Sequence, residues 1–369
     1  MKRAVLISGL GVLIGLSSCS KENLPDLSPN DYITFSAPNV ISETNSRSTF
    51  IEGSLPEDGE FGVMGYCVPF ERDQNVPDWD SGSSPWTYKR SNAYPDVFYK
   101  RRVSANGAYN YIESENGLRK WYNAEDDKDA VDPDNYDYTF FAYYPYDNFT
   151  VTPDDKNTKG APKMTFTMPF DGTDLSLDDS QTPDAMLGIV YSHKRSQGNV
   201  QLNFSHIMTG LRFAVNNYNL GAENEESITI NSIELKGNFV KSITIDFNKE
   251  TNEEGFYYCE GTYHGTYSLI NEPIIVGPNS SNTPEKYLLL LSDAAGKTYF
   301  GEDIIVSVNY TYKNTTKVFT APRPTDFMPK AGTRYTAQLN FIGESFALKF
   351  VAEGGGFWED GKDSNITIQ

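Results

Sequence analysis

Apolar and polar residues alternate along much of this chain with the two-residue period of a half-buried β-strand. The alternation is clearest at 199–215, NVQLNFSHIMTGLRFAV, and it predicts two strands separated by a break at Met208 to Gly210. Phe204 and Leu211 are predicted to be buried. His206 is expected in the corner between the strands, where its imidazole would satisfy backbone groups that the break leaves unpaired. Catalysis would need a nucleophile or carboxylate beside it, and the sequence names no candidate.

Similar short apolar runs, bounded by turn residues, recur in both halves of the chain. YITFSAP at 32–38 predicts the first strand, with Ile33 and Phe35 on one face and Pro38 closing it. About nine more strand-like runs follow residue 227, and no segment shows a convincing helical period. The pattern therefore predicts an all-β fold built of sandwiches.

The N-terminus has the pattern of a lipoprotein signal peptide. MKR is followed by an apolar run that is shorter than the ~20 residues needed to cross a bilayer, and the run ends in Leu16-Ser17-Ser18-Cys19, which resembles a lipobox. We expect residues 1–18 to be removed and Cys19 to be lipidated. Residues 19–30 then form a flexible tether, since their polar and proline content gives them little to bury.

The remaining length indicates two domains. About 350 residues is long for a single core, and the composition turns polar and charged at AENEES, close to residue 222. We expect an N-terminal domain over 31–222 and a C-terminal domain over 223–369.

The charge balance argues against nucleic acid as a partner. The chain has 31 basic and 50 acidic residues and a formal net charge of −19, whereas a nucleic-acid surface needs clustered positive charge. Six aspartates in one predicted loop suggest calcium, but the spacing lacks the glycine and glutamate of an EF-hand, so we expect a solvated loop, no metal and no cofactor. They are Asp126, Asp127, Asp129, Asp132, Asp134 and Asp137.

Cys67 and Cys259 allow two interpretations. An exported protein permits a disulfide between them. Both also lie in apolar strand-like runs, where a buried thiol is an ordinary core residue. Their wide separation, in different predicted domains, favours two thiols.

The sequence does not predict an enzyme. It has no G-x-S-x-G, H-E-x-x-H or C-x-x-C motif, and its three histidines, His193, His206 and His264, lie in separate segments. A catalytic pair of carboxylates of the glycosidase type stays an open alternative, because the 50 acidic residues form many pairs whose distances the sequence does not give.

Several motifs, taken in order, resemble the fimbrillin-like (Mfa-like) lipoproteins of Bacteroidetes. They are FGVMGYC at 61–67, KWYNAE at 120–125, YTFFAYYPY at 138–146, DAMLG at 184–188, V-x-L-x-F-x-H at 200–206, L-x-F-x-V at 211–215 and AGTRYTAQLNF at 331–341. The resemblance implies two tandem β-sandwich domains of the transthyretin/Ig-like Greek-key type. It also implies a non-enzymatic component of a type V pilus, held at the outer membrane by its lipid, with other pilus subunits and host or bacterial surface ligands as partners.

The same resemblance implies an assembly step. In the family, a protease cuts after an arginine in the loop that follows the first strand, and the strand then leaves. The C-terminal strand of another subunit fills the groove. Arg47 matches the cleavage position, Ile33 and Phe35 the displaced strand, and Ile366 and Ile368 in SNITIQ the donor. Alternatively, Arg47 is a solvated loop residue and SNITIQ pairs within its own domain.

A surface glycan-binding lipoprotein is the alternative function. Aromatic residues make up 14% of the chain, with 24 tyrosines and 4 tryptophans, and exposed rings stack on apolar faces such as those of sugars. Large β-cores also use tyrosine and tryptophan freely. Three exposed rings on one platform would favour glycan binding; the four candidates are Trp79, Trp86, Trp121 and Trp358.

Overall fold

The computed structural model describes residues 32–41, 51, 53–69, 94–104, 119–121, 136–152, 160–169, 175–176, 182–220, 227–251, 253–284, 287–291, 303–324, 327, 329–353 and 364–365. Within these ranges the regular elements are strands, apart from the 3-10 turns η3 (Tyr146–Asn148) and η4 (Arg195–Gln197). The prediction of an all-β fold is confirmed. The described part of the chain contains no helix with the length and apolar character of a membrane span.

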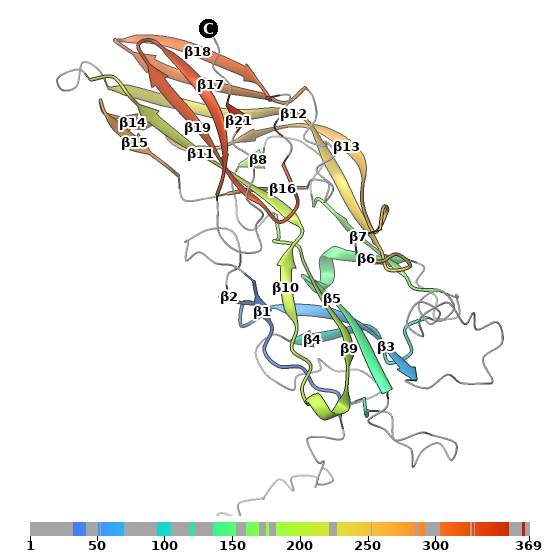
Figure 1. Cartoon of the computed structure of the whole chain (residues 1–369). Helices are drawn as coiled ribbons and strands as arrows, with labels where there is room; N and C mark the ends of the chain where they lie inside the picture. Colours follow the sequence, from blue (N-terminus) through green and yellow to red (C-terminus); the bar gives the residue numbers. More distant parts are fainter. Residues whose placement is uncertain are drawn as a thin grey trace, which may run out of the picture.

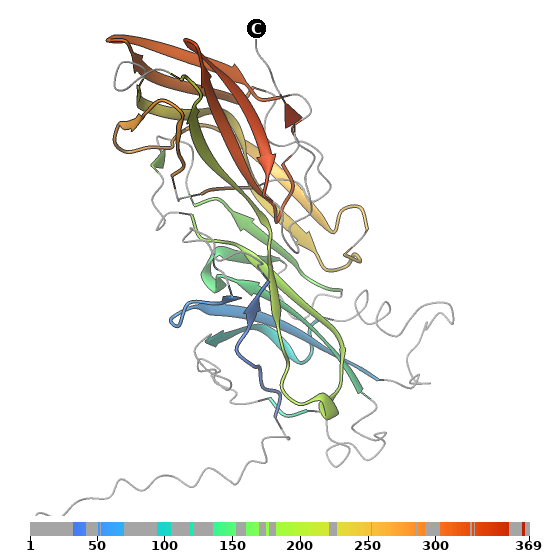
Figure 2. The same cartoon turned by 60° about the vertical axis from the view of Figure 1, so that its left-hand side comes forward.

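The strands form three sheets along an elongated molecule (Figures 1 and 2). The 7-stranded sheet lies at the lower end in Figure 1, and its order is β2-β1-β10-β9-β5-β3-β4. Its strands are β1 (Asn39–Val40), β2 (Gly53–Ser54), β3 (Glu60–Pro69), β4 (Phe98–Ser104), β5 (Tyr136–Tyr144), β9 (Met186–His193) and β10 (Asn203–His206).

The other two sheets extend to the upper end of the molecule. The 6-stranded sheet has the order β15-β11-β19-β20-β21, and β16 also pairs with β11. The 8-stranded sheet has the order β18-β17-β12-β13-β8, and β14 and β7 also pair with β12, while β6 pairs with β7. Their bounds are β6 (Phe149–Thr152), β7 (Lys163–Thr167), β8 (Leu175–Ser176), β11 (Met208–Asn217), β12 (Ile228–Asp246), β13 (Tyr257–Ser268), β14 (Ile274–Val276), β15 (Ser280–Asn282), β16 (Leu288–Leu291), β17 (Ile305–Tyr312), β18 (Thr315–Pro322), β19 (Arg334–Ile342), β20 (Ser345–Ala352) and β21 (Ser364–Asn365).

Hydrogen bonding crosses the expected domain boundary near residue 222. β11, which precedes this boundary, pairs in parallel with β19 over eight residue positions, and β7 pairs with β12. The sheets therefore do not divide where the composition changes. The division into two domains at this residue stays a prediction.

The predicted break at Met208 to Gly210 is wrong in its position. β10 ends at His206 and β11 begins at Met208, so only Ile207 interrupts the strands. The Ile207 N–H donates to the carbonyl of Ala185 at 3.0 Å, and the Tyr257 hydroxyl donates to the Ile207 carbonyl at 2.8 Å. Met208 already pairs with Leu291. The chain thus moves from one sheet to the next within one residue.

Two hydrophobic cores lie on opposite faces of the 7-stranded sheet. Alternation along β5 sends Phe141 and Tyr143 into the larger core, which continues through all three sheets, and Phe140 and Ala142 into the smaller one. The predicted burial of two core residues is confirmed, since Phe204 is 0% exposed in the smaller core and Leu211 is 1% exposed in the larger.

Candidate functional site

The first described segment, 32–41, lies parallel to β10 and completes the smaller core (Figure 1). Ile33 and Phe35 are both buried in this core, as predicted, but Thr34 between them is also buried, so core and surface positions do not alternate strictly. The Phe35 ring packs against three phenylalanines at centroid distances of 5.7 to 6.1 Å, namely Phe61, Phe98 and Phe140. These contacts make the segment part of the core although it lies at the start of the described chain.

Backbone hydrogen bonds between this segment and residues 200–204 are irregularly spaced. Ser36 donates to Val200, Asn39 to Leu202 and Ile41 to Phe204, each at 3.0 Å, and Val200 donates to Thr34 at 2.7 Å. Pro38 has no N–H, so the donor after Ser36 is Asn39 and the ladder shifts by one residue. The predicted strand over 32–38 is therefore reduced to isolated bridges at Tyr32 and Phe35, and regular pairing starts at Asn39.

β1 lies between two strands, parallel to β10 and antiparallel to β2. If this segment left, β10 and β2 would each have an open edge, and the pockets of Ile33, Phe35 and Val40 would be empty. Such a groove binds an extended chain by adding a strand, in which backbone bonds supply affinity and alternate side chains supply specificity. The arrangement is thus of a kind that can bind an extended chain without covalent chemistry.

His206 forms a buried pair with a carboxylate at the end of β10. Its Nδ1 lies 2.9 Å from Oδ1 of Asp184, and both side chains are 1% exposed. The other carboxylate oxygen of Asp184 accepts a hydrogen bond from the Ile51 backbone N–H at 2.9 Å. Burial raises the pKa of nearby Tyr144, and the charges of Asp184 and Asp58 raise it further.

The sequence predicts that His206 binds backbone groups, whereas in the structure its partner is the carboxylate of Asp184. Asp184 lies 22 positions earlier in the chain, and a sequence does not show which polar residues meet across neighbouring strands. The sequence feature that could have indicated this partner is Asp184 itself, which stands at the start of DAMLG directly before a strongly apolar run. The pair therefore connects the end of β10 with the backbone at Ile51.

A protein-family model described as fimbrillin-like matches residues 86–351. The chain belongs to the fimbrillin-like family. Fimbrium subunit Fim1C of Phocaeicola vulgatus is similar to it, with 23% identity over 397 aligned residues that cover 96% of each protein. The crystal structure of a fimbrial protein from Bacteroides vulgatus matches with a TM-score of 0.53 and 17% identity, over 87% of this chain and 99% of that one, and supports the fold.

The proposed processing residues of this fimbrillin-like protein lie outside the described residues. These are Cys19, Arg47, Ile366 and Ile368. The part of the terminal segment that is described, β21, pairs with β20 through Asn365 and Ser364. This pairing is the arrangement expected if SNITIQ stays within its own chain.

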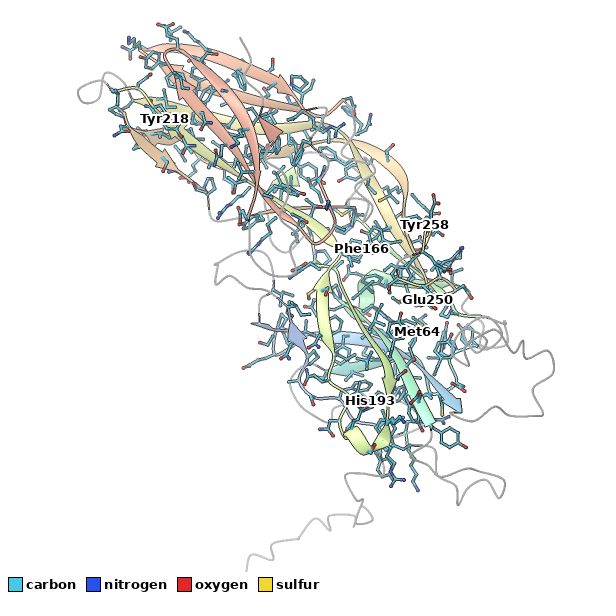
Figure 3. All side chains as sticks on the ribbon, in the orientation of Figure 1. Met64, Phe166, His193, Tyr218, Glu250 and Tyr258 are labelled. Atoms are coloured by element: carbon cyan, nitrogen blue, oxygen red, sulfur yellow. The ribbon has the colours of Figure 1, made fainter. Side chains whose placement is uncertain are left out.

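Trp121 is buried in the smaller core of this protein beside His193, which Figure 3 labels near the lower end of the molecule. It is 3% exposed, stacks on the His193 imidazole at 5.7 Å and meets the Tyr138 ring edge-on at 4.8 Å. Burial lowers the pKa of His193, while a hydrogen bond with the Gly198 carbonyl at 3.0 Å acts in the opposite direction. Trp121 therefore does not contribute to an exposed sugar-binding platform, and Trp79, Trp86 and Trp358 lie outside the described residues.

The two cysteines of the described chain carry thiols rather than a shared disulfide. Cys67 lies in β3 and Cys259 in β13, on different sheets. This arrangement agrees with the favoured interpretation. Among the described residues no group of three or more histidine, cysteine or acidic side chains could hold a metal, and of the six aspartates in the acidic loop only Asp137 is described.

A polar cluster at the end of β20 was not predicted. Glu353 accepts hydrogen bonds from the hydroxyls of Tyr287 and Thr336 and pairs with the Arg212 guanidinium at 2.7 Å. Burial raises the pKa of Tyr287, and the hydrogen bond to Glu353 raises it further. The cluster holds the chain at the point where it leaves β20 toward the C-terminus, but its members come from four distant segments, so no local pattern could reveal it.

Proposed function

We propose that this protein is a structural or adhesive subunit of a type V-like pilus at the cell surface. Membership of the fimbrillin-like family and the relative named Fimbrium subunit Fim1C support this role. The observation that carries the proposal is the way segment 32–41 completes the smaller core as a separate parallel strand. We infer a non-catalytic role, because the site chemistry is strand addition.

Assembly proceeds by protease-triggered strand exchange. Arg47 lies in the connection between Ile41 and Ile51, so a cut after Arg47 leaves segment 32–41 with no covalent link to the fold downstream. The segment is then held by its packing, by backbone hydrogen bonds with residues 200–204 and with Arg119, and by the pairing of β1 with β10 and β2. Its departure opens the groove between β10 and β2.

The C-terminal segment of another subunit supplies the new strand. Ile366 and Ile368 are two residues apart, the spacing of Ile33 and Phe35, so an extended donor can place both side chains into the two vacated pockets. The described residues of this segment, Ser364 and Asn365, pair with β20 in their own sheet, and this pairing is given up when the segment leaves.

Lipidation of Cys19 anchors the subunit to the outer membrane. Labelled fatty acid should be incorporated into the wild type and be absent from a Cys19→Ala variant. Label retained by the variant would contradict lipidation at this residue. The control is the Cys67→Ala variant, which keeps the lipobox and should incorporate label like the wild type.

The assembly proposal is tested by treating the purified protein with an arginine-specific protease and separating the products by size under native conditions. Cutting at Arg47 should release residues up to Arg47 and produce oligomers. The Arg47→Ala variant should stay uncut there and form no assembly larger than the uncleaved wild type forms, and a chain lacking residues 364–369 should be cut without forming larger assemblies. A cut monomer that still holds its first segment would overturn strand exchange.

A further inference from the structure

The sheets of this protein mostly end in strands that are short or blunted. β2, β8 and β21 have two residues each, and β15 has three. β4 is longer, but it carries Lys100, Arg101 and Arg102, and Lys100 has a positive φ of 47° beside a shift in register. Shortness, charge and bulges all discourage pairing with another chain.

β18 is an edge strand that is neither short nor bulged, and it carries a single charged residue, Lys317. It is eight residues long, forms the end of the 8-stranded sheet, and pairs with β17 without a register shift from Tyr312↔Thr315 to Ile305↔Pro322. Figure 1 shows it at the outer margin of the upper end of the molecule. Among the described strands none pairs with its outer side.

The hairpin geometry identifies the backbone groups on that outer side. Lys313 and Asn314 have φ values of 47° and 58°, which is the conformation of a two-residue type I′ turn. The residues that flank such a turn, Tyr312 and Thr315, form a hydrogen-bonded pair, and these pairs alternate along the ladder. The N–H and C=O groups of Thr316, Val318 and Thr320 therefore point away from β17.

The exposed face of β17 and β18 beside this edge carries no charged side chain. Val318 is 63% exposed there, and cross-strand hydrogen bonds order its neighbours: the Asn231 amide donates to Asn309 at 3.0 Å and to Thr311 at 3.1 Å. The side chains that share this face are Thr229, Asn231, Ser307, Asn309, Thr311, Thr316, Val318 and Thr320. None of them is charged, although the chain as a whole has a net charge of −19.

We propose that β18 pairs antiparallel with β18 of a second copy of this chain, about a two-fold axis at Val318. This register places Val318 opposite Val318 of the second copy and Thr316 opposite Thr320 of the second copy. All the outward backbone groups of these three residues are then paired. β-Branched side chains also meet directly across the new interface, and such cross-strand pairs are favourable.

Charge makes a second copy a suitable partner for this edge. Two strongly acidic molecules repel each other at most approaches, whereas the neutral face of β18 brings no acidic side chains together. The charged residue of the strand, Lys317, would lie opposite Phe319 of the second copy rather than opposite another lysine. Its ammonium is already paired with Glu344 at 2.8 Å.

The proposal can be tested by sedimentation velocity on the purified, uncleaved protein over a range of concentrations. The wild type should show a monomer–dimer equilibrium. Val318→Lys and Val318→Glu each place two like charges on the axis, and each should raise the dissociation constant at least about tenfold. An equimolar mixture of the two variants should recover the dimer, because opposite charges then meet.

Ile342→Lys is the matched control, since Ile342 is similarly exposed at 60% but lies in β19 of the other sheet. It should dimerise like the wild type, and circular dichroism should show that all variants are folded. A wild type that stays monomeric, a Val318→Lys variant that still dimerises, or a mixture that recovers no dimer would overturn the proposal. The dimer requires neither cleavage at Arg47 nor residues 364–369, so this test and that of strand exchange can fail separately.

Discussion

The two hydrophobic cores bury their side chains equally well but are closed by different backbone arrangements. The larger core is covered by the hairpins β17–β18 and β19–β20, each with eight paired positions in register. The smaller core is completed by segment 32–41, which combines isolated bridges with the two-residue strand β1. Phe341 in the larger core and Phe204 in the smaller are both 0% exposed.

This difference shows that the burial of a core and the strength with which its covering segment is held are separate properties. A hairpin strand is held by its ladder and by its turn, so it opens only when the sheet opens. Segment 32–41 precedes the rest of the fold in the chain, and its backbone bonds are irregularly spaced. A core can therefore be fully packed although one covering segment is held by an irregular backbone arrangement, which is what the proposed strand exchange requires.

The largest expected effect comes from a core phenylalanine. Phe204→Ala should lower the free energy of unfolding by about 3–5 kcal/mol, because a large buried ring leaves a cavity. Phe341→Ala should cost a similar amount in the larger core, which makes it the matched variant. Denaturant titrations measure both, and a loss below about 1 kcal/mol for Phe204→Ala would contradict its role in the core.

Phe35→Ala should affect the smaller core and leave the larger core unchanged. Losing this ring should cost about 3 kcal/mol, and the cost should fall on local opening of the first segment. Native-state hydrogen exchange should show faster exchange at the Ser36, Asn39 and Ile41 amides, with the amides of the β11–β19 ladder unchanged. Equal acceleration in both regions would mean that the segment opens only with the whole molecule.

Asp184→Asn should have a smaller effect, about 1–3 kcal/mol, because the amide nitrogen that replaces one carboxylate oxygen cannot accept a hydrogen bond. The Ile51 amide should exchange faster, since its acceptor is lost or reoriented. Asp58→Asn is the control, because Asp58 is exposed. Unchanged protection of Ile51 would show that Asp184 does not hold this part of the chain.

The smallest effect concerns Asp246, which ties β12 to β7 in the larger core. Burial alone would raise its pKa, but hydrogen bonds from Asn248 and the pair with Lys163 at 3.1 Å hold the pKa below its ordinary value of 3.8. A lowered pKa contributes stability above the unfolded value, and this contribution is lost as the pH falls through the folded pKa.

Asp246→Asn should therefore remove about 1 kcal/mol near neutral pH. The stability difference between the variant and the wild type should shrink as the pH falls below about 4. Denaturation at a series of pH values measures this difference. A constant difference at all pH values would contradict the pairing with Lys163.

The alternation of apolar and polar residues predicted where the strands lie better than it predicted where they begin and end. The two strands of 199–215 and the burial of Phe204 and Leu211 followed from a two-residue period, because that period reports which side chains face a core. The sequence predicted a break between the two strands at Met208 to Gly210. In the structure Met208 pairs with Leu291, so β11 already begins inside the predicted break. Pro38 was predicted to close the first strand, whereas the regular pairing of β1 begins directly after it.

The sequence by itself determined the all-β class, the buried face of the first segment and the family, because each rests on local periodicity or on motifs in a particular order. Only the tertiary structure decided that Asp184 meets His206, that Glu353 joins residues of four segments, and that β18 is a long open edge. These features depend on which strands become neighbours. Pairing partners are chosen by packing across the whole molecule, and residues far apart in the chain carry no local sign of it.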